Sequence, residues 1–135
     1  MAGRSESAGT QDLETLLRTM EPELVAGQFV FVAVPEPMPG LVAEAMVRES
    51  EGITYVIARH EADVRALEYD FVAAWITLRV HSALDAVGLT AAVSSALADA
   101  GISCNVLAGR FHDHLLVPFD SARAALDVLE ELAER

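Results

Sequence analysis

The chain has 135 residues, of which 53% are hydrophobic and 22% are charged, a composition typical of a globular protein. Its 21 acidic residues outnumber 9 basic residues, all of them arginine, so the net charge is −12. Binding to nucleic acids or anionic lipids depends on positive charge, and this balance argues against both as partners. The single cysteine excludes an intrachain disulfide, and we expect a cytoplasmic protein that is not bound to a membrane.

The first half of the chain reads as a tail followed by short elements. Residues 1–10 lack the apolar core of a secretory signal and are expected to be disordered. Apolar residues at helical spacing precede Pro22, whereas β-branched and aromatic runs follow Gly27 and the proline-rich segment 35–40. The expected elements are a helix over 13–20, strands over 29–34, 42–48 and 53–58, and a short helix over 60–67.

The second half has a clearer order of strand, helix, strand, strand and helix. Gly101 suits the position just past a helix end, and Gly109-Arg110 fits a two-residue hairpin turn. These are five of the six elements of a ferredoxin-like βαββαβ unit. The missing closing strand must be shared, supplied by the first half, or supplied by a partner chain. The expected elements are strands over 71–80, 102–108 and 111–117, and helices over 89–100 and 122–132.

Side-chain alternation gathers polar residues at one edge of this predicted sheet. If Phe111, Leu115 and Val117 pack under the helices, then His112 and His114 share the opposite face with His81. Ser103 and Asn105 alternate onto that same face. The prediction is a small-molecule site where these side chains meet the loop over 82–88.

This loop can hold a ligand at the start of the following helix. The backbone N–H groups of Gly88, Leu89 and Thr90 can bind a carboxylate with help from the helix dipole. Asp85 can accept an ammonium group, with Asn105 fixing the orientation. The alternative is that Ser82 and Asp85 only cap the helix, because they have the spacing of a capping box with Asp in place of Glu.

Two motifs of this region resemble the ACT domain, a ligand-binding regulatory module. They are DAVGL at residues 85–89 and GISCN at residues 101–105, and Val87 stands where ACT loops often have proline. The longer strings VHSALDAVGLTAAV and HDHLLVP, with LETLLRTMEPEL near the start, resemble a bacterial family of tandem ACT-like proteins of unassigned function. The resemblance implies an α+β, ferredoxin-like fold with antiparallel sheets and helices on one face. Its two ACT-like subdomains would span residues 11–70 and 71–135.

The function that the resemblance implies is a non-enzymatic sensor that binds a free amino acid and needs no cofactor. A homodimer is expected, because ACT sheets commonly pair and an open face with Thr77, Arg79 and Leu107 needs cover. The alternatives are a ligand-free assembly module and a small metal enzyme, in which His81, His112 and His114 act with Asp113 or Asp85. Cys104 is expected to be a small buried hydrophobe. The expected ligand contacts are His81, Ser82, Asp85, Val87, Gly88, Leu89, Thr90, Asn105, His112 and His114.

Overall fold

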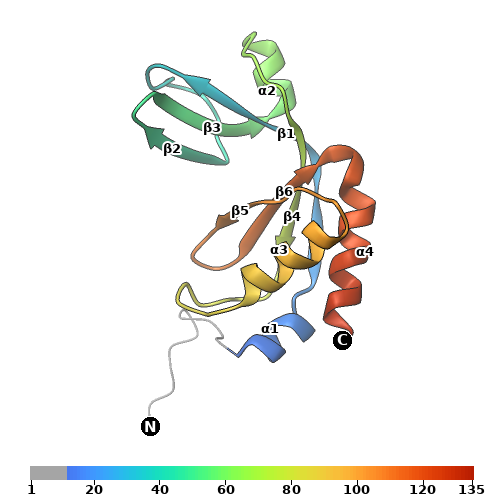
Figure 1. The fold of residues 1–135 in the computed structure, drawn as a ribbon. Helices are drawn as coiled ribbons and strands as arrows, with labels where there is room; N and C mark the ends of the chain where they lie inside the picture. The colour runs from blue at the N-terminus through green and yellow to red at the C-terminus, as the bar shows by residue number, and fades with distance from the viewer. Residues whose placement is uncertain (1–11) are drawn as a thin grey trace.

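The computed structural model describes residues 12–135, so the expected tail over 1–10 lies outside the described residues (Figure 1). None of the helices among them is long and apolar enough to cross a bilayer. Along the chain the elements are α1 (Leu13–Arg18), β1 (Pro22–Val34), β2 (Ala45–Glu49), β3 (Gly52–Ala58), α2 (Arg59–Val64), β4 (Val72–Leu78), α3 (Leu89–Asp99), β5 (Asn105–Ala108), β6 (Asp113–Pro118), a 3₁₀ turn (Phe119–Ser121) and α4 (Ala122–Ala133).

All strands belong to a single antiparallel sheet with the order β2-β3-β1-β4-β6-β5. The long strand β1 pairs with β4, and from Phe29 onward it also pairs with β3. A register shift separates Val25 from Phe29, and Gly27 within it has φ +109°, a conformation that suits glycine. The sheet is therefore continuous from one half of the chain to the other.

The strand order shows that the first half of the chain supplies the missing closing strand. In a ferredoxin-like unit built from β4, α3, β5, β6 and α4, the closing strand lies beside β4, and β1 occupies that place. Reciprocally, β4 lies beside β1 in the unit formed by β1, β2, β3 and α2. The two central strands are thus shared by both halves.

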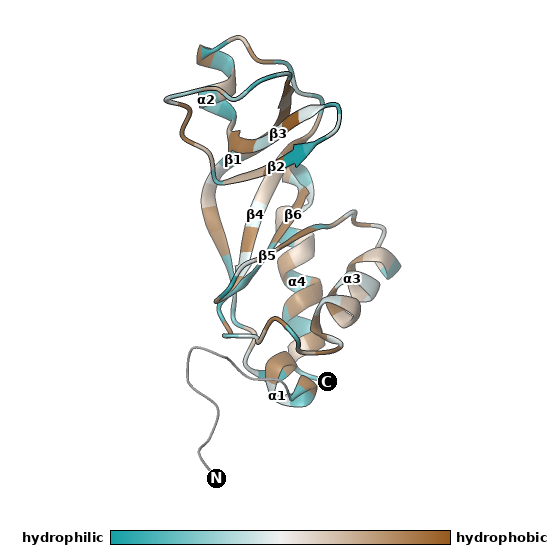
Figure 2. Cartoon of the chain, turned by 90° about the vertical axis from the view of Figure 1, so that its left-hand side faces the viewer, coloured by the Kyte–Doolittle hydropathy of each residue, from teal (hydrophilic) through white to brown (hydrophobic). Residues whose placement is uncertain are grey.

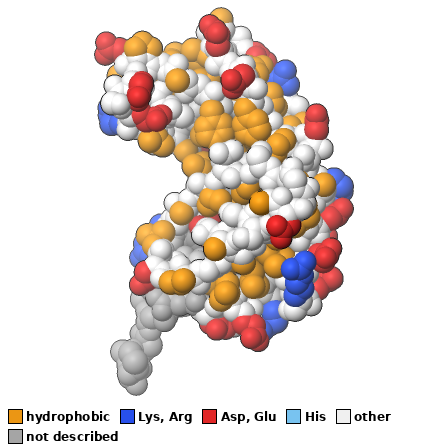
Figure 3. Space-filling model, viewed as in Figure 1, with side chains coloured by type: hydrophobic (Ala, Val, Ile, Leu, Met, Phe, Trp, Pro, Cys, Tyr) orange, Lys and Arg blue, Asp and Glu red, His pale blue; other side chains and the backbone are white. Residues whose placement is uncertain are grey.

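Helices α2, α3 and α4 cover one face of the sheet and leave the other face open (Figures 1 and 2). Under α3 and α4 lies the larger apolar core, and under α2 lies a smaller one. The open face carries a third cluster whose fully or nearly buried members are Phe29, Val56, Ala73 and Leu116. A hollow lies between the part with β2 and β3 and the part with β5, and apolar side chains line it (Figure 3).

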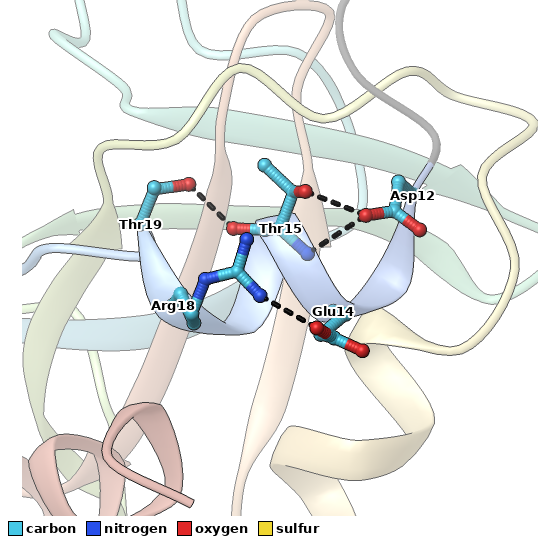
Figure 4. A network of polar contacts seen from close by, with 5 residues as sticks. All are labelled: Asp12, Glu14, Thr15, Arg18 and Thr19. Atoms are coloured by element: carbon cyan, nitrogen blue, oxygen red, sulfur yellow. Dashed lines mark hydrogen bonds and ion pairs between the residues drawn. The ribbon is translucent and has the colours of Figure 1, made fainter.

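The short helix α1 is fixed at both ends and packs under the larger core. Asp12 caps it, accepting hydrogen bonds from the backbone N–H and the hydroxyl of Thr15, and these bonds lower the pKa of Asp12 (Figure 4). Leu16 and Met20 are fully buried among the residues of the larger core. The Leu13 side chain lies against Gly88, where a Cβ would come within 3.0 Å of it. Helix α1 therefore covers the start of α3.

Several expected strand boundaries were wrong, because backbone hydrogen bonding or side-chain packing differs from the local pattern. The strand expected over 102–108 begins at Asn105, because the Ile102 N–H bonds to the Leu97 carbonyl (2.9 Å) and closes the end of α3. The strand expected over 42–48 begins at Ala45, after a segment that packs Met38 and Leu41 into the smaller core. Conversely, the strand expected over 29–34 begins at Pro22, since β4 pairs with its first residues.

The hairpin turn was also misplaced. The Gly109 N–H donates to the His112 carbonyl (2.9 Å), so Arg110 and Phe111 form the tip instead of Gly109 and Arg110. Phe111, expected under the helices, is 56% exposed, because the tip projects beyond the ladder and its ring lies against His81 (centroids 5.4 Å apart). The face assignment of Leu115 and Val117 is confirmed, since both are fully buried in the larger core.

Candidate functional site

A small cavity of about 130 Å³ lies between the β4–α3 loop and the β5–β6 hairpin. It is on the helix-covered side of the sheet. Two hydroxyls and one carboxylate are among the side chains around it. Its lining residues are Ser82, Ala83, Leu84, Ala86, Leu89, Thr90, Ala108 and Asp113.

Wider hollows elsewhere present charged groups that are exposed or already paired. One of about 600 Å³ runs along residues 31–33 and 66–70, where Glu68 and Asp70 are exposed. Another of about 520 Å³ lies beside the bulge of β1. Its Arg59 donates hydrogen bonds to the Tyr69 hydroxyl (2.8 Å) and to the Gln28 side chain (3.1 Å). The small cavity is therefore the stronger candidate.

The start of α3 forms one wall of the cavity. Gly88 is its N-cap with φ +107°, and no side chain caps it. The capping role considered for Ser82 and Asp85 is thus wrong, because both lie too far before the first helical residue, Leu89. The first intrahelical bond runs from the Ala92 N–H to the Gly88 carbonyl (2.8 Å), so the Leu89 and Thr90 N–H groups have no partner within the helix.

Asp113 forms the opposite wall and is only 8% exposed. It is the first residue of β6 and lies between Leu78 of β4 and Ala108 of β5. Among residues 12–135, no donor forms a hydrogen bond or ion pair with its carboxylate. Burial raises the pKa of Asp113, while the nearby charges of His114 and His112 lower it. A mostly buried carboxylate without a donor carries a desolvation cost, which a bound cation would offset.

His114 lies on the open face, away from the cavity. Its Nδ1 accepts a hydrogen bond from Trp75 Nε1 (3.3 Å) and lies 3.0 Å from the Thr77 hydroxyl, which pairs with it across β4 and β6. Burial lowers the pKa of His114. The ring is therefore neutral near pH 7, and its role in the structure is to satisfy polar groups within an apolar face.

His81 and His112 lie together beside the hairpin tip, with ring centroids 6.4 Å apart. His112 Nδ1 is 3.2 Å from the Val80 carbonyl, whereas His81 Nε2 is buried without a partner among the described residues. His114 faces Trp75 instead of joining them. Residues 12–135 bring no three His, Cys, Asp or Glu side chains together as a possible metal site, so the geometry gives the three-histidine hypothesis no support.

Some of the remaining predicted ligand contacts line the cavity and others lie away from it. Ser82, Leu89 and Thr90 line the cavity, and Gly88 is adjacent to it. Asp85 and Val87 are not among the lining residues, and both are exposed, Val87 at 83%. Asn105 lies opposite Leu116 on the open face, about 10 Å along β5 from Ala108, because Ala108 is three residue steps further along the strand.

Asp113 is the cavity residue that the sequence-based site omitted. The alternation that buries Leu115 and Val117 also directs Asp113 toward the helix side, and a carboxylate at such a core position is a detectable signal. Cys104 is half-buried against the larger core, and burial raises the pKa of its thiol, as suits an unreactive apolar side chain.

Comparisons with known proteins identify the family. Models of the ACT domain match residues 8–74 and residues 71–131. A protein of unknown function from Vibrio cholerae, described as a possible transport protein, shares 45% identity over 90% of this chain and 95% of its own, with a TM-score of 0.82. None of the curated proteins matches the chain.

More distant structures share the fold. A protein from Agrobacterium tumefaciens has 19% identity and a TM-score of 0.66 over 83% of this chain and 87% of its own. The ligand-free regulatory subunit of aspartate kinase from Thermus thermophilus has 10% identity and a TM-score of 0.63 over 85% of this chain and 97% of its own. The chain belongs to the ACT-domain family and carries two ACT matches in tandem.

Proposed function

We propose that the protein is a non-enzymatic regulatory module that binds a free amino acid at the cavity beside the β4–α3 loop. The observation that carries this proposal is that helix N–H groups without a partner among residues 12–135 lie across one small cavity from a mostly buried carboxylate. A zwitterion satisfies both at once, because the helix start favours its carboxylate and Asp113 favours its ammonium group. The likeness to an aspartate kinase regulatory subunit supports a regulatory role.

The exposed apolar side chains around the cavity support a homodimer. Leu84, Val87 and Phe111 are 63%, 83% and 56% exposed, and they lie on the loop and on the hairpin tip that border it. A second copy packed on these side chains removes them from water, and a ligand that favours the packed arrangement then shifts the population toward it. This coupling is how a module without catalytic groups of its own regulates a partner. We place it in the cytoplasm.

A thermal unfolding screen of the full chain against the twenty amino acids tests this function. Ligand at about 100 times its dissociation constant stabilises the folded state by about 2.7 kcal/mol, which raises the melting temperature by several degrees. We expect at least one amino acid to do so at millimolar concentration. If none of them raises the melting temperature, the proposed function is wrong. Size-exclusion chromatography with light scattering, with and without that amino acid, tests the dimer.

A further inference from the structure

We infer that the ligand is one of the smallest amino acids, glycine, alanine or serine, and that its ammonium group binds Asp113 instead of Asp85. The inference rests on the proposed function and specifies its chemistry. It follows from three observations: the place of Asp113 in the fold, the groups around its carboxylate and the volume of the cavity.

Asp113 stands at a position that the other half of the sheet fills with an apolar residue. In the second half, Asp113 of β6 lies opposite Leu78, the last residue of β4, and both face the helices. In the first half, Ile53 of β3 lies opposite Val34, the last residue of β1, and it is 5% exposed in the smaller core. A core position that carries a carboxylate in one half alone departs from the packing rule, and such departures mark functional sites.

The groups around this carboxylate suit an ammonium ion. No donor among residues 12–135 hydrogen-bonds to Asp113, and the two side-chain hydroxyls at the cavity, on Ser82 and Thr90, can accept from the same ammonium group. Ser82 is 8% exposed, and its hydroxyl donates a long hydrogen bond (3.4 Å) to the Ala83 carbonyl, which leaves its lone pairs available. Asp85 lies outside the lining of the cavity.

The cavity volume limits the rest of the ligand. About 130 Å³ is well below the range of roughly 300 to 1,000 Å³ typical of drug-sized ligands. A cavity of this size favours glycine, alanine or serine over amino acids with larger side chains. We expect branched and aromatic side chains to bind less tightly, because Leu89 is packed at 2% exposure and forms a wall that cannot recede without loss of core contacts.

Isothermal titration calorimetry on the full chain tests the size limit. Glycine, L-alanine, L-serine, L-leucine, methylammonium and acetate serve as probes. We expect the three small amino acids to bind at least about 10-fold more tightly than leucine. Methylammonium should bind weakly through Asp113, and acetate should bind no more tightly than methylammonium. Tightest binding of leucine or another large amino acid would overturn the inference.

Three isosteric Asp→Asn variants test the acceptor. Because a hydrogen bond to a charged group contributes about 1.5 to 3 kcal/mol, Asp113→Asn should weaken the tightest small amino acid by about 10- to 150-fold. Asp85→Asn should leave its affinity within about 2-fold. Asp99→Asn is the matched control, since it removes the same charge from an exposed position at the end of α3.

A second variant keeps the test decisive if Asp113→Asn folds poorly. Ala108→Leu fills the cavity from the opposing strand without changing any charge, and it should also abolish binding. Unchanged affinity in Asp113→Asn or in Ala108→Leu would overturn the inference while the proposed function stands, as would a loss of affinity in Asp85→Asn alone. If the wild-type chain binds no amino acid, the proposed function itself fails.

Discussion

The two halves of the sheet follow one strand plan but use the space after their first strand differently. In each half the third strand in sequence pairs with the first, and a helix follows it, α2 in one half and α4 in the other. After β4 the chain forms α3, whereas after β1 it forms the proline-rich segment 35–44, which inserts Met38 and Leu41 into the smaller core. In the first half this segment packs apolar side chains against the smaller core, whereas in the second half the small cavity lies beside the corresponding loop.

Under the proposed function, this difference assigns core packing and ligand binding to equivalent positions in the two halves of the sheet. At equivalent register positions the first half has Ile53 and the second half has Asp113. Isoleucine at this position contributes packing, whereas aspartate costs desolvation and offers a charge to a ligand. At this position, therefore, one half of the sheet has a packing residue and the other half has the proposed ligand contact.

The largest expected effect on stability comes from placing aspartate, the residue of the second half, at the equivalent position of the first half. Ile53→Asp places an unpaired charge in a closed apolar core, and we expect the free energy of unfolding to fall by about 4 kcal/mol or more. Urea denaturation measures it. Ile53→Val is the control, with an expected loss of about 1 kcal/mol. A loss as small as that of the control would break the comparison, because the first half would then tolerate the same carboxylate.

A second prediction tests whether the halves unfold together. Ile57→Ala in the smaller core and Leu115→Ala in the larger core remove fully buried side chains, and each should cost about 3 kcal/mol. Because β1 and β4 are shared, both variants should show one transition by circular dichroism and by the fluorescence of Trp75 on β4. Transitions that separate between the two probes would contradict a single cooperative sheet. Val64→Ala at a 69% exposed position serves as the control.

A third prediction compares the stability cost of alanine at the two glycines that flank α3, one beside the cavity and one away from it. Gly88→Ala must adopt φ +107° and its Cβ meets the Leu13 side chain at 3.0 Å, so we expect a loss of about 2 kcal/mol. Gly101→Ala adopts φ +76° in open space, and about 1 kcal/mol should be lost. Chemical denaturation ranks the two. In a double-mutant cycle, Leu13→Ala should reduce the cost of Gly88→Ala and leave that of Gly101→Ala unchanged.

The smallest expected effect is a pH dependence that belongs to the second half alone. Burial raises the folded-state pKa of Asp113 above the ordinary value of 3.8, so between these two pKa values the folded state binds more protons than the unfolded state. Stability contributed by this group therefore falls as pH rises through that window. Asp113→Asn removes this loss, and its melting temperature should exceed that of the wild type at neutral pH.

The two melting temperatures should converge below pH 3.8, where both side chains are neutral. Because the charge of Asp113 raises the pKa of His114, Asp113→Asn also lowers the His114 pKa, and the gap is therefore judged at the acidic end of the range. Thermal unfolding of the ligand-free proteins from pH 3 to pH 8 measures the gap. A gap that stays constant across this range would contradict a raised pKa for Asp113.

The sequence predicted the element types well and the site only partly. Helical spacing and strand alternation are local signals, and they located α1, α3 and α4 and the face of Leu115 and Val117. The sharing of β1 was not predictable, because it depends on pairing with residues far along the chain. In the candidate site, the glycine of the loop predicted one wall of the cavity, whereas Asp113 was considered only as a carboxylate of the metal-enzyme alternative, because it stands between two histidines.

The shared central pair also governs when the chain can fold during synthesis. Phe29 pairs with Ala73 and Pro22 pairs with Leu78, so β1 leaves the ribosome well before its partner strand exists. The chain loses the entropy of closing this long loop before β1 and β4 gain their pairing contacts, and this cost delays formation of the sheet centre. Until β4 has been translated, β1 presents an unpaired apolar edge that can join a neighbouring chain. The architecture thus makes the nascent first half the aggregation-prone stage in the life of this protein.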